Sequence, residues 1–223
     1  MKDITVFINA RKGSSRLVNK ILKPFAGTTL FEIAVEKIGK LVRCEKYICA
    51  YDEEFFEFPR DVSIKTFRRS LDSVIVDMPL RKVFECFEYF STSHVMFLNP
   101  CHAFLSVKTI QSVIDDFISN EAVSATSVLK TNDWIFSENG SLIYPLDIAG
   151  GNTKDTTNSF RVAHAFHIFD RVRFLEKDDM LWAYKNRDPQ LCEISKIESI
   201  DVDDNEDFFI SENLYNSLIS GAK

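Results

Sequence analysis

The sequence lacks any apolar run that approaches the roughly 20 residues a membrane-spanning helix needs. Its apolar start at residues 4–10 is too short for a signal-peptide core, and cations follow it instead of preceding it. The five cysteines are odd in number and show no C-x-x-C spacing, which argues against a disulfide framework or a zinc site. With a formal charge of −6 and mostly scattered basic residues, no binding surface for nucleic acid is expected. These absences favour a cytoplasmic protein whose partners are neither membranes nor nucleic acids.

Apolar residues make up 45% of the 223 residues, and 20 residues are phenylalanine, which excludes a disordered chain. The length suits one domain over residues 1–223. Short β-prone runs alternate with helical patterns, and this alternation predicts a layered α/β fold with a mostly parallel sheet. Strands are predicted at 4–10, 46–51, 62–67, 94–99, 122–129 and 160–169. Helices are predicted after a capping box at 29–32, at 79–90, along 107–117 and around 208–218.

One stretch interrupts this pattern. From about residue 131 to residue 158 the sequence breaks into short aromatic pieces and contains the pair Gly150-Gly151. Such a stretch predicts a hairpin excursion or an arm inserted in the domain.

A group of cations follows the first predicted strand. Arg11, Arg16 and Lys20 are spaced along a loop that also contains Gly13 and Ser14. Loops at the carboxyl ends of parallel strands form the ligand crevice of an open sheet, and guanidinium groups, an ammonium group and loop amides together suit a triphosphate. The loop matches neither G-x-x-x-x-G-K-[ST] nor G-x-G-x-x-G. On charge alone, a phosphate site and a solvated surface loop are equally good interpretations.

Two aspartates near the C-terminus are separated by one residue. On a strand, Asp201 and Asp203 would point to the same side, where both carboxylates could hold a hard cation such as Mg²⁺ together with phosphate oxygens. The other interpretation is a solvated acidic turn in which Asp203 or Asp204 caps the last helix. From these residues alone, the turn is the better interpretation.

Three segments resemble the motifs of one family. Residues 8–24, INARKGSSRLVNKILKP, resemble the opening signature of the cytidylyltransferases that activate sialic acids and related keto-deoxy sugar acids, and are also similar to spore-coat polysaccharide transferases. Residues 97–105, FLNPCHAFL, are similar to the family's L-Q-P-T-S-P-L-R, and residues 199–208, SIDVDDNEDF, are similar to its S-I-D-I-D-T-x-x-D-F. The order and spacing agree over nearly the whole chain. The sequence therefore resembles a divergent acylneuraminate cytidylyltransferase.

The resemblance implies a three-layer α/β/α sandwich of the nucleotide-diphospho-sugar transferase (GT-A) type. It implies a reaction in which CTP and an acceptor hydroxyl give a CMP conjugate and pyrophosphate, with Mg²⁺ as cofactor. The implied partners are CTP, a small acidic or sugar acceptor, and a second copy of the chain that pairs through the arm. With the family in view, metal binding becomes the better interpretation of Asp201 and Asp203. The residues assigned to the nucleotide are Ala10, Arg11, Gly13, Ser14, Arg16, Lys20, Arg68 and Asn99, of which Arg11, Arg16 and Lys20 are also assigned to catalysis. Arg68 and Arg69 both fall where the resemblance implies an arginine near the nucleotide, and surface cations at a strand end are an equally good interpretation of the two.

Departures from the family pattern fall near the acceptor. Leu105 stands where the family's motif ends in arginine, and Ala163-His164 stand where the family carries Asn-Gly. We therefore expect nucleotide activation to be retained and the acceptor pocket to be altered, with His102 and His164 as substrate-binding residues. His164 and His167 are an odd number of residues apart on a predicted strand, so we expect them to face opposite sides.

Two other functions remain open. A metal-dependent glycosyltransferase of similar fold would use a D-x-D pair for the metal of a sugar nucleotide, but it gives no use to the cations of residues 11–20. A family member that has lost catalysis and only binds a nucleotide is compatible with Leu105 and Ala163. Pyrophosphate release from CTP with a panel of sugar acids separates the three functions.

Overall fold

One sheet forms the centre of the protein. The structure is a computed structural model that describes residues 2–14, 16–58, 61–75, 78–143, 159–177, 179–185 and 187–221. The strands of the sheet are β1 (Ile4–Asn9), β4 (Glu45–Ala50), β5 (Ile64–Arg68), β6 (His94–Leu98), β7 (Ala125–Thr131), β8 (Ser159–Asp170) and β9 (Gln190–Glu193). Their order is β5-β4-β1-β6-β8-β7-β9, and only β8 runs antiparallel to its neighbours in this sheet. The prediction of a mostly parallel sheet is confirmed.

Side chains of β1 alternate between two cores. Val6 and Ile8 are fully buried in a larger core on one face of the sheet, whereas Phe7 is fully buried in a smaller, aromatic core on the other face. Successive residues of a strand point to opposite faces, so a strand buried on both faces has to be apolar almost throughout. The apolar run at residues 4–8 thus accounts for the central position of β1.

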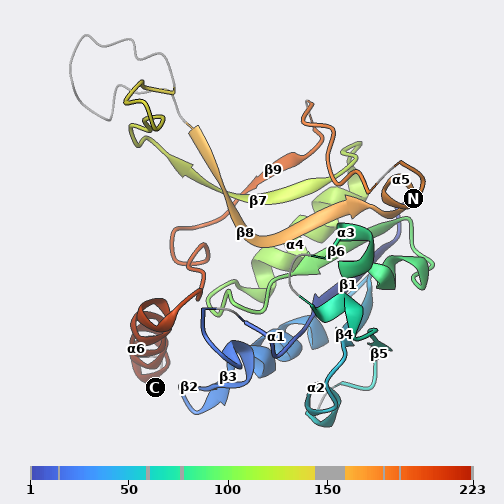
Figure 1. Cartoon of the computed structure of the whole chain (residues 1–223), viewed down its shortest axis with the longest axis horizontal. Helices are drawn as coiled ribbons and strands as arrows, with labels where there is room; N and C mark the ends of the chain where they lie inside the picture. The colour runs from blue at the N-terminus through green and yellow to red at the C-terminus, as the bar shows by residue number, and fades with distance from the viewer. Residues whose placement is uncertain are drawn as a thin grey trace.

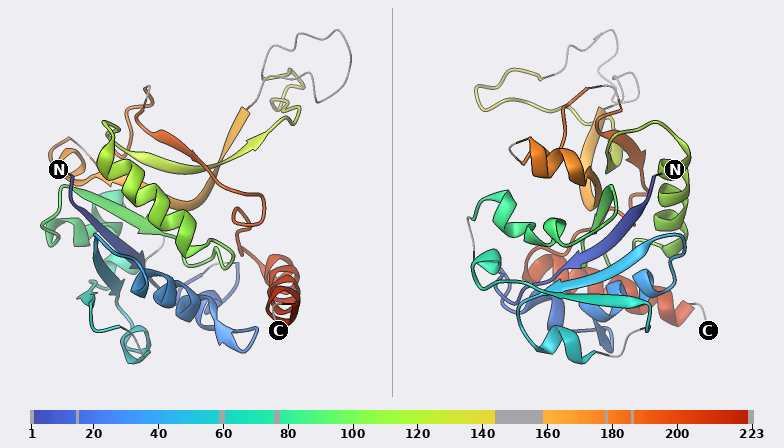
Figure 2. Two further views of the ribbon diagram at one scale, coloured as in Figure 1. Left: turned by 180° about the vertical axis from the view of Figure 1, so that it is seen from behind. Right: turned by 90° about the vertical axis from the view of Figure 1, so that its right-hand side faces the viewer.

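Helices cover both faces of the sheet (Figure 1; Figure 2). α1 (Leu30–Gly39) and α4 (Val107–Ser119) pack into the larger core, while η3 (Glu85–Glu88) and α5 (Arg171–Glu176) pack into the smaller one. Thr29 caps α1 as predicted, because its hydroxyl accepts a hydrogen bond from the Glu32 N–H at 3.0 Å, and the Glu32 carboxylate accepts from that hydroxyl at 3.2 Å. Helices on both sides of the sheet make the predicted three-layer sandwich.

The last helix lies beside a small hairpin instead of on the sheet (Figure 1). The Phe25 ring of this hairpin contacts the rings of Phe208 and Tyr215 at centroid separations of 5.3 and 5.4 Å. The Ala26 N–H donates to the Glu212 carboxylate at 2.9 Å. These contacts fix the C-terminal helix next to the loop that follows β1. The elements not yet given are the hairpin strands β2 (Pro24–Phe25) and β3 (Thr28–Thr29), the helix α6 (Asn205–Gly221), and the short helices η1 (Lys20–Leu22), α2 (Glu54–Glu57), η2 (Asp72–Val74) and α3 (Leu80–Val83).

Two local predictions are wrong, and one strand was not predicted. The helix predicted at 79–90 is broken into α3 and η3, because Phe84 leaves the helical conformation and its ring packs against Phe87 and Phe174 in the smaller core. Residues 201–203 form no strand but an irregular segment that leads into α6. The strand that was not predicted is the edge strand β9. Its residues alternate between half-buried and exposed, so it lacks the fully buried apolar residues that mark the other strands.

The pairing of β7 with β8 contains a bulge. The register shifts between Thr126 and Val128, which leaves extra residues in β8. Within them, His164 adopts a left-handed backbone with φ 57°. The bulge interrupts the regular alternation of β8 side chains between the two faces of the sheet. As a result, Nδ1 of His164 lies 3.2 Å from Nε2 of His167. The prediction that these two histidines face opposite sides is therefore wrong.

Three further expectations concern the chain as a whole. Within the described ranges, no helix has the length and apolar character to cross a bilayer. All five cysteines are free. Of the arm predicted at 131–158, the structure describes residues 131–143, where an isolated bridge joins Phe136 to Leu142. Residues 144–158 lie outside the described residues.

Candidate active site

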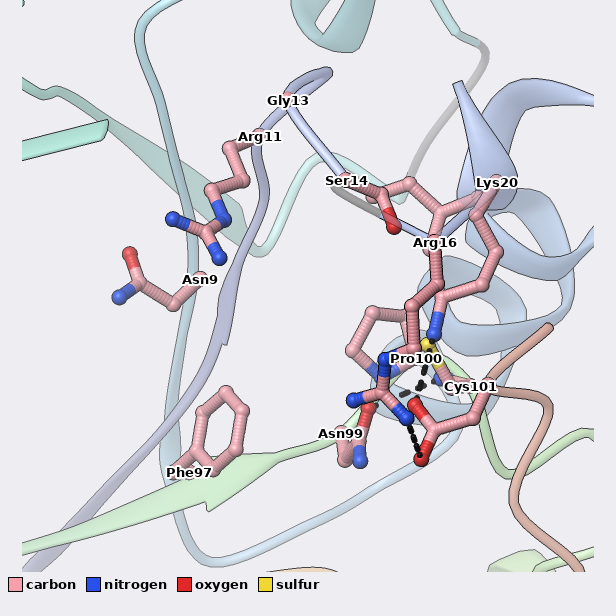
Figure 3. A pocket seen from close by; sticks show the side chains of 12 residues that line it. Asn9, Arg11, Gly13, Ser14, Arg16, Lys20, Phe97, Asn99, Pro100 and Cys101 are labelled. Atoms are coloured by element: carbon pink, nitrogen blue, oxygen red, sulfur yellow. Dashed lines mark hydrogen bonds and ion pairs between the residues drawn. The ribbon is translucent and has the colours of Figure 1, made fainter. Parts of the chain in front are cut away.

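A pocket of about 290 Å³ opens at the carboxyl ends of β1 and β6 (Figure 3). β1 ends at Asn9 and β6 is followed directly by Asn99, and both side chains line the pocket. Adjacent parallel strands end at the same edge of a sheet, which is where ligands bind in open α/β folds. The lining residues are Asn9, Arg11, Gly13, Ser14, Arg16, Lys20, Ile21, Phe97, Asn99, Pro100, Cys101 and Asp203.

The loop after β1 is anchored at both ends, which holds its cations at the pocket. Its start continues the sheet, since the Ala10 N–H donates to the Cys49 carbonyl at 2.8 Å. Its end is held by the buried side chains of Leu17 and Ile21. Asn19, with φ 54°, then turns the chain into η1. Apolar residues inside an otherwise polar loop thus give it a defined position.

Lys20 joins this loop to the segment before α6. Its ammonium group donates to the Val202 carbonyl at 2.5 Å and to the Asp203 carboxylate at 3.2 Å, and its side chain is 12% exposed. Burial acts to lower the pKa of Lys20, but Cys101 and Asp203 act more strongly together and raise that pKa above its ordinary value. The ammonium group is therefore charged at neutral pH.

The two arginines of the loop are more exposed than Lys20. Arg16 lies with Nη1 3.0 Å from the Asp203 carboxylate, and its side chain is 65% exposed. Arg11 also lines the pocket but lies apart from Arg16, near Asn9 (Figure 3). The described lining residues thus include three cations and a single carboxylate. This imbalance favours an anionic ligand that can bind several cations at once.

Asp201 and Asp203 do not share a strand, yet they remain close enough to interact. Oδ1 of Asp201 is buried and has no hydrogen-bond partner among the described residues. Burial, followed by the charge of Asp203, raises the pKa of Asp201 to about 6. Nδ1 of His102 is 3.8 Å from Oδ1 of Asp201, which is beyond hydrogen-bond distance.

A hard divalent cation would compensate this carboxylate pair. An unpaired buried carboxylate oxygen is unfavourable, and Mg²⁺ is usually bound by one or two carboxylates together with phosphate oxygens and water. The two aspartates therefore fit Mg²⁺. Within the described ranges, no three acidic, histidine or cysteine side chains are grouped to hold a metal, so phosphate oxygens and water would have to complete the coordination.

The helix cap suggested for this segment is provided by Asp204. Its Oδ1 accepts hydrogen bonds from the N–H groups of Glu206 and Asp207 at 2.9 and 3.0 Å. The Asp207 carboxylate in turn accepts from the N–H groups of Asp203 and Asp204. The side chain of Asp203 is not used for capping and points to the loop cations.

The structure brings some of the other predicted nucleotide residues to the pocket and leaves two outside it. Those at the pocket are Gly13, Ser14 and Asn99. Ala10 is fully buried and does not line the pocket. Arg68 is exposed, and its guanidinium group donates to the Tyr51 carbonyl at 3.0 Å and to the Glu53 carboxylate at 2.6 Å. Its placement does not support a role at the nucleotide.

The two histidines predicted for the acceptor lie in different environments. The side chain of His102 is fully buried and its Nε2 lies 2.9 Å from the Ala163 carbonyl. Burial lowers the pKa of His102 to about 4, so it is neutral, and in this position it does not reach a ligand. His164 is exposed, and its carbonyl accepts a hydrogen bond from the Asn99 side chain at 3.1 Å.

A second hollow, of about 350 Å³, adjoins the pocket and contains Arg69. Arg69 is 3% exposed, and its guanidinium group donates to the carbonyls of Ala10 and Val83 at 3.4 and 3.2 Å. Arg68 and Arg69 were both candidates from the sequence, and only Arg68 was assigned to the nucleotide. Consecutive residues at a strand end point in opposite directions, so only the register of β5 could have decided between the two arginines. The residues shared by both cavities are Asn9, Arg11 and Phe97, and no pattern in the sequence pointed to Phe97 as a site residue.

The sheet order, the helical layers and the pocket at the carboxyl edge define an α/β fold of the nucleotidyltransferase type. The cytidylyltransferase family model matches residues 5–176, which is more than half of the chain, and the chain belongs to this family. No curated protein matches the sequence. Family membership therefore rests on the family model, not on a characterised relative.

Solved structures of cytidylyl-transferring enzymes have the same fold. A CMP:2-keto-3-deoxy-manno-octonic acid synthetase complexed with CTP is 11% identical, with a TM-score of 0.68 over 97% of this chain and 99% of that chain. A 4-diphosphocytidyl-2C-methyl-D-erythritol synthase from Anaerococcus prevotii is 12% identical, with a TM-score of 0.64 over 96% of each chain. The bifunctional IspDF from Campylobacter jejuni is 12% identical, with a TM-score of 0.61 over 93% of this chain and 53% of that one. At these identities the likeness shows the fold.

Proposed function

We propose that the chain transfers CMP from CTP to a hydroxyl group of a small acidic or sugar acceptor, in a Mg²⁺-dependent reaction that releases pyrophosphate. The family supports the nucleotide and the class of reaction. The observation that carries the proposal is the pocket at the carboxyl edge of the sheet, which Arg11, Arg16 and Lys20 line and in which Arg16 and Lys20 pair with Asp203.

The loop cations are placed to hold the triphosphate. Arg16 and Lys20 are both paired with Asp203, so their charged groups are oriented toward one point. Phosphate oxygens offer each cation a stronger, charge-assisted partner, and a guanidinium group can bind two of them at once. A glycosyltransferase with the same aspartates would give this convergence of cations no comparable use.

The transfer itself requires positioning and charge compensation more than covalent chemistry. The oxygen of the acceptor hydroxyl would attack the α-phosphorus in line and release its proton to water, and the bond from that phosphorus to the bridging oxygen would break. The bonding electrons leave with pyrophosphate, and the loop cations offset the charge that develops there. When bound by Asp201 and Asp203, Mg²⁺ would supply further compensation to the phosphate oxygens. The Val202 N–H donates to the Cys101 carbonyl at 3.2 Å, which holds this segment against the loop after β6.

The acceptor is proposed to be an acid other than N-acetylneuraminic acid. Leu105 is 1% exposed and belongs to the larger core, so it offers nothing to a carboxylate. Lys37 lies nearby, but its ammonium group donates to the carbonyls of His102 and Ala103 at 2.9 and 2.7 Å, and burial lowers the pKa of Lys37 to about 7. Neither residue replaces the arginine of the family's motif as a binding group for a carboxylate.

A homodimer through the arm is part of the proposal. Trp134, Phe136 and Phe160 are exposed on the described part of the arm and on the adjoining start of β8. Exposed aromatic side chains gathered in one region are typical of a protein interface. Light scattering during gel filtration should give the mass of two chains, and a monomer mass at all concentrations would contradict the proposed dimer.

The central experiment measures pyrophosphate release from CTP with 2-keto-3-deoxy-manno-octonic acid, N-acetylneuraminic acid and smaller hydroxy acids, with and without Mg²⁺. We expect release with at least one acid and Mg²⁺, and slower release with N-acetylneuraminic acid than with the best acid. UTP, GTP and ATP serve as matched controls for the nucleotide. Absence of release with every acid would contradict the proposed transferase, and efficient turnover of N-acetylneuraminic acid would contradict the altered acceptor pocket.

A further inference from the structure

Asn9, the last residue of β1, places an amide at the edge of an apolar core. Thr5, Phe7 and Asn9 share one face of the strand, because successive side chains alternate between the two faces. Phe7 is fully buried in the smaller core, and the Thr5 hydroxyl is paired with the Thr92 hydroxyl at 2.8 Å. An apolar side chain at position 9 would continue this core, whereas an amide is unfavourable there unless its polar atoms are paired. The presence of asparagine thus points to a use for its side chain.

One hydrogen bond fixes the orientation of this amide. Its nitrogen, Nδ2, donates to the Val83 carbonyl at 3.2 Å. A carbonyl oxygen only accepts hydrogen bonds, so the amide nitrogen has to face Val83 and the amide oxygen has to face away from it. Oδ1 of Asn9 is buried and has no hydrogen-bond partner among the described residues. This oxygen is therefore an acceptor that a donor on a ligand can pair.

A second asparagine at the pocket is in the opposite state. Asn99 also lines the pocket, but both ends of its amide are paired within the chain. Its Oδ1 accepts a hydrogen bond from the Cys101 N–H at 3.0 Å, and its Nδ2 donates to the His164 carbonyl at 3.1 Å. Of the two asparagines that line the pocket, only Asn9 keeps an unused buried acceptor within the part of the chain that the structure describes. A ligand can therefore gain a hydrogen bond at Asn9 without breaking one inside the protein.

Asn9 lies where the pocket meets the second hollow, since it lines both cavities. It lies near Arg11 and apart from Arg16 and Lys20 (Figure 3). A triphosphate held by Arg16 and Lys20 would therefore extend its nucleoside toward Asn9 and the hollow. The hollow suits a flat ring, because apolar side chains form much of its wall. These side chains are Ile75, Met78, Val83, Phe84 and Phe97.

We propose that Asn9 determines specificity for the nucleoside, with its Oδ1 accepting a hydrogen bond from an N–H or O–H donor of the nucleoside. Ionised phosphate oxygens only accept hydrogen bonds, so the triphosphate is not this partner. CTP offers such donors in the 4-amino group of cytosine and in the two ribose hydroxyl groups. A nucleotide that lacks the donor leaves the buried oxygen unpaired and binds less tightly. The inference rests on the proposed function, because it requires a triphosphate on the loop cations.

Calorimetric titration of the natural protein with four nucleotides identifies the donor. UTP lacks the 4-amino group of CTP, 2′-deoxy-CTP lacks the 2′-hydroxyl group, and 3′-deoxy-CTP lacks the 3′-hydroxyl group. We expect one of these three analogues to bind about tenfold less tightly than CTP, which is the effect of one lost hydrogen bond. The analogue that binds weakly shows which group pairs with Asn9. Equal affinities for all four nucleotides would overturn the inference.

A variant without the amide then assigns this difference to Asn9. Asn9→Leu changes the shape little, and the Val83 carbonyl still accepts a hydrogen bond from Arg69 at 3.2 Å. We expect CTP to bind about tenfold less tightly to Asn9→Leu while the weak analogue binds as before, so that the difference between the two nucleotides disappears. Asn9→Ala repeats the test without adding volume, so a folding defect in Asn9→Leu does not decide the outcome. A difference that persists in Asn9→Ala or in folded Asn9→Leu would contradict the role of Asn9.

Asn99→Leu is the matched control for the loss of an amide at the pocket. The Asn99 oxygen is already paired with the Cys101 N–H, so the difference between CTP and the weak analogue should persist in this variant, whatever happens to the affinity for both nucleotides. Loss of the difference in Asn99→Leu as well as in Asn9→Leu would assign it to the shape of the pocket and overturn the inference.

These titrations separate failure of the inference from failure of the proposed function, because they need neither an acceptor nor turnover. A preference for CTP that depends on Asn9 supports the inference even if no acid releases pyrophosphate, and the proposed transferase would then fail alone. If an acid releases pyrophosphate but Asn9→Leu keeps the preference of the natural protein, the inference fails and the proposed transferase stands.

Discussion

The two halves of the sheet differ in regularity. Strands β5, β4, β1 and β6 pair in parallel without interruption, whereas β7 and β8 pair antiparallel with a shift in register. The regular half brings the loop cations to the carboxyl edge. The irregular half carries the bulge that places His164 beside His167. Regular pairing thus builds the part of the site expected to bind the nucleotide, and irregular pairing builds the part expected to bind the acceptor.

This division accounts for where the chain departs from its family. The segment of residues 8–24 resembles the family's opening signature, and it lies entirely in the regular half with its loop and hairpin. Ala163 and His164, which replace the family's Asn-Gly, lie in the bulge of the irregular half. Variation in the second half can change the acceptor without disturbing the loop that faces the nucleotide.

The largest effect is expected for Asp203→Asn. A neutral amide is a poorer ligand for a hard cation than a carboxylate, so Mg²⁺-dependent turnover should fall about 100-fold, equivalent to about 2.7 kcal/mol. The matched control is Asp204→Asn, which removes the neighbouring charge but keeps a good helix cap. Turnover is measured against Mg²⁺ concentration in both variants. Equal losses of turnover in Asp203→Asn and Asp204→Asn would show that the effect comes from removing negative charge near α6, and would contradict a metal-binding role for Asp203.

A smaller effect, on stability, is expected from His167 in the irregular half. Burial lowers the pKa of His167 to about 3, so below pH 6.5 the unfolded chain binds a proton that the folded chain does not. The folded state is therefore destabilised as the pH falls from about 6.5 toward 3, by up to about 1.4 kcal/mol per pH unit. Between pH 7 and pH 5, the free energy of unfolding should therefore fall by about 2 kcal/mol less in His167→Phe than in the natural protein.

Urea unfolding at several pH values measures this difference. Asp201 has the opposite effect on the free energy of unfolding. Its pKa is raised in the folded chain, so between about pH 6 and pH 3.8 the folded chain binds a proton that the unfolded chain does not. That contribution is present in both proteins and cancels in the comparison. Parallel stability curves for the natural protein and His167→Phe would show that His167 is not kept neutral by burial.

Turnover is expected to fall about tenfold in Arg16→Ala, equivalent to about 1.4 kcal/mol. Arg16 lines the pocket but is largely exposed, which limits its contribution. Arg68→Ala is the matched control, because Arg68 is equally a surface arginine in an ion pair but lies outside the pocket. A greater loss of kcat/KM in Arg68→Ala than in Arg16→Ala would reverse the assignment made from the structure.

The smallest effect compares two substitutions at one position of the bulge. His164→Ala and His164→Gly both remove the ring, but only alanine retains the strain of a positive φ. We expect the glycine variant to be the more stable by about 0.5 to 1 kcal/mol in urea unfolding. Greater stability of the alanine variant would contradict the left-handed conformation assigned to residue 164.

Much of the fold could be predicted from the sequence because buried parallel strands are apolar almost throughout. The run at residues 4–8 marks β1, and the polar residues after it mark the loop at its carboxyl end. The bulge could not be predicted, since it depends on how β8 pairs with β7 and not on any residue within β8 alone. The same holds for Arg69, whose burial follows from the register of β5.

For the candidate site, the residues that follow a strand end directly were predicted, whereas those that depend on packing were not. Gly13, Ser14 and Asn99, which the sequence assigned to the nucleotide, line the pocket. His102 was expected to bind the substrate but is buried, because its ring reaches back to the Ala163 carbonyl in β8. No sequence pattern indicates such a contact between segments 61 residues apart.

The most direct test of the account is the affinity of the protein for CTP compared with CMP, measured by calorimetry. If the loop cations hold the triphosphate, CTP should bind at least about tenfold more tightly than CMP, and Lys20→Ala should remove most of that difference. Lys23→Ala is the control, because Lys23 lies over the Phe208 ring and does not line the pocket. The account predicts a CTP preference that depends on Lys20 and not on Lys23. Equal preference for CTP in the natural protein and in Lys20→Ala would contradict it.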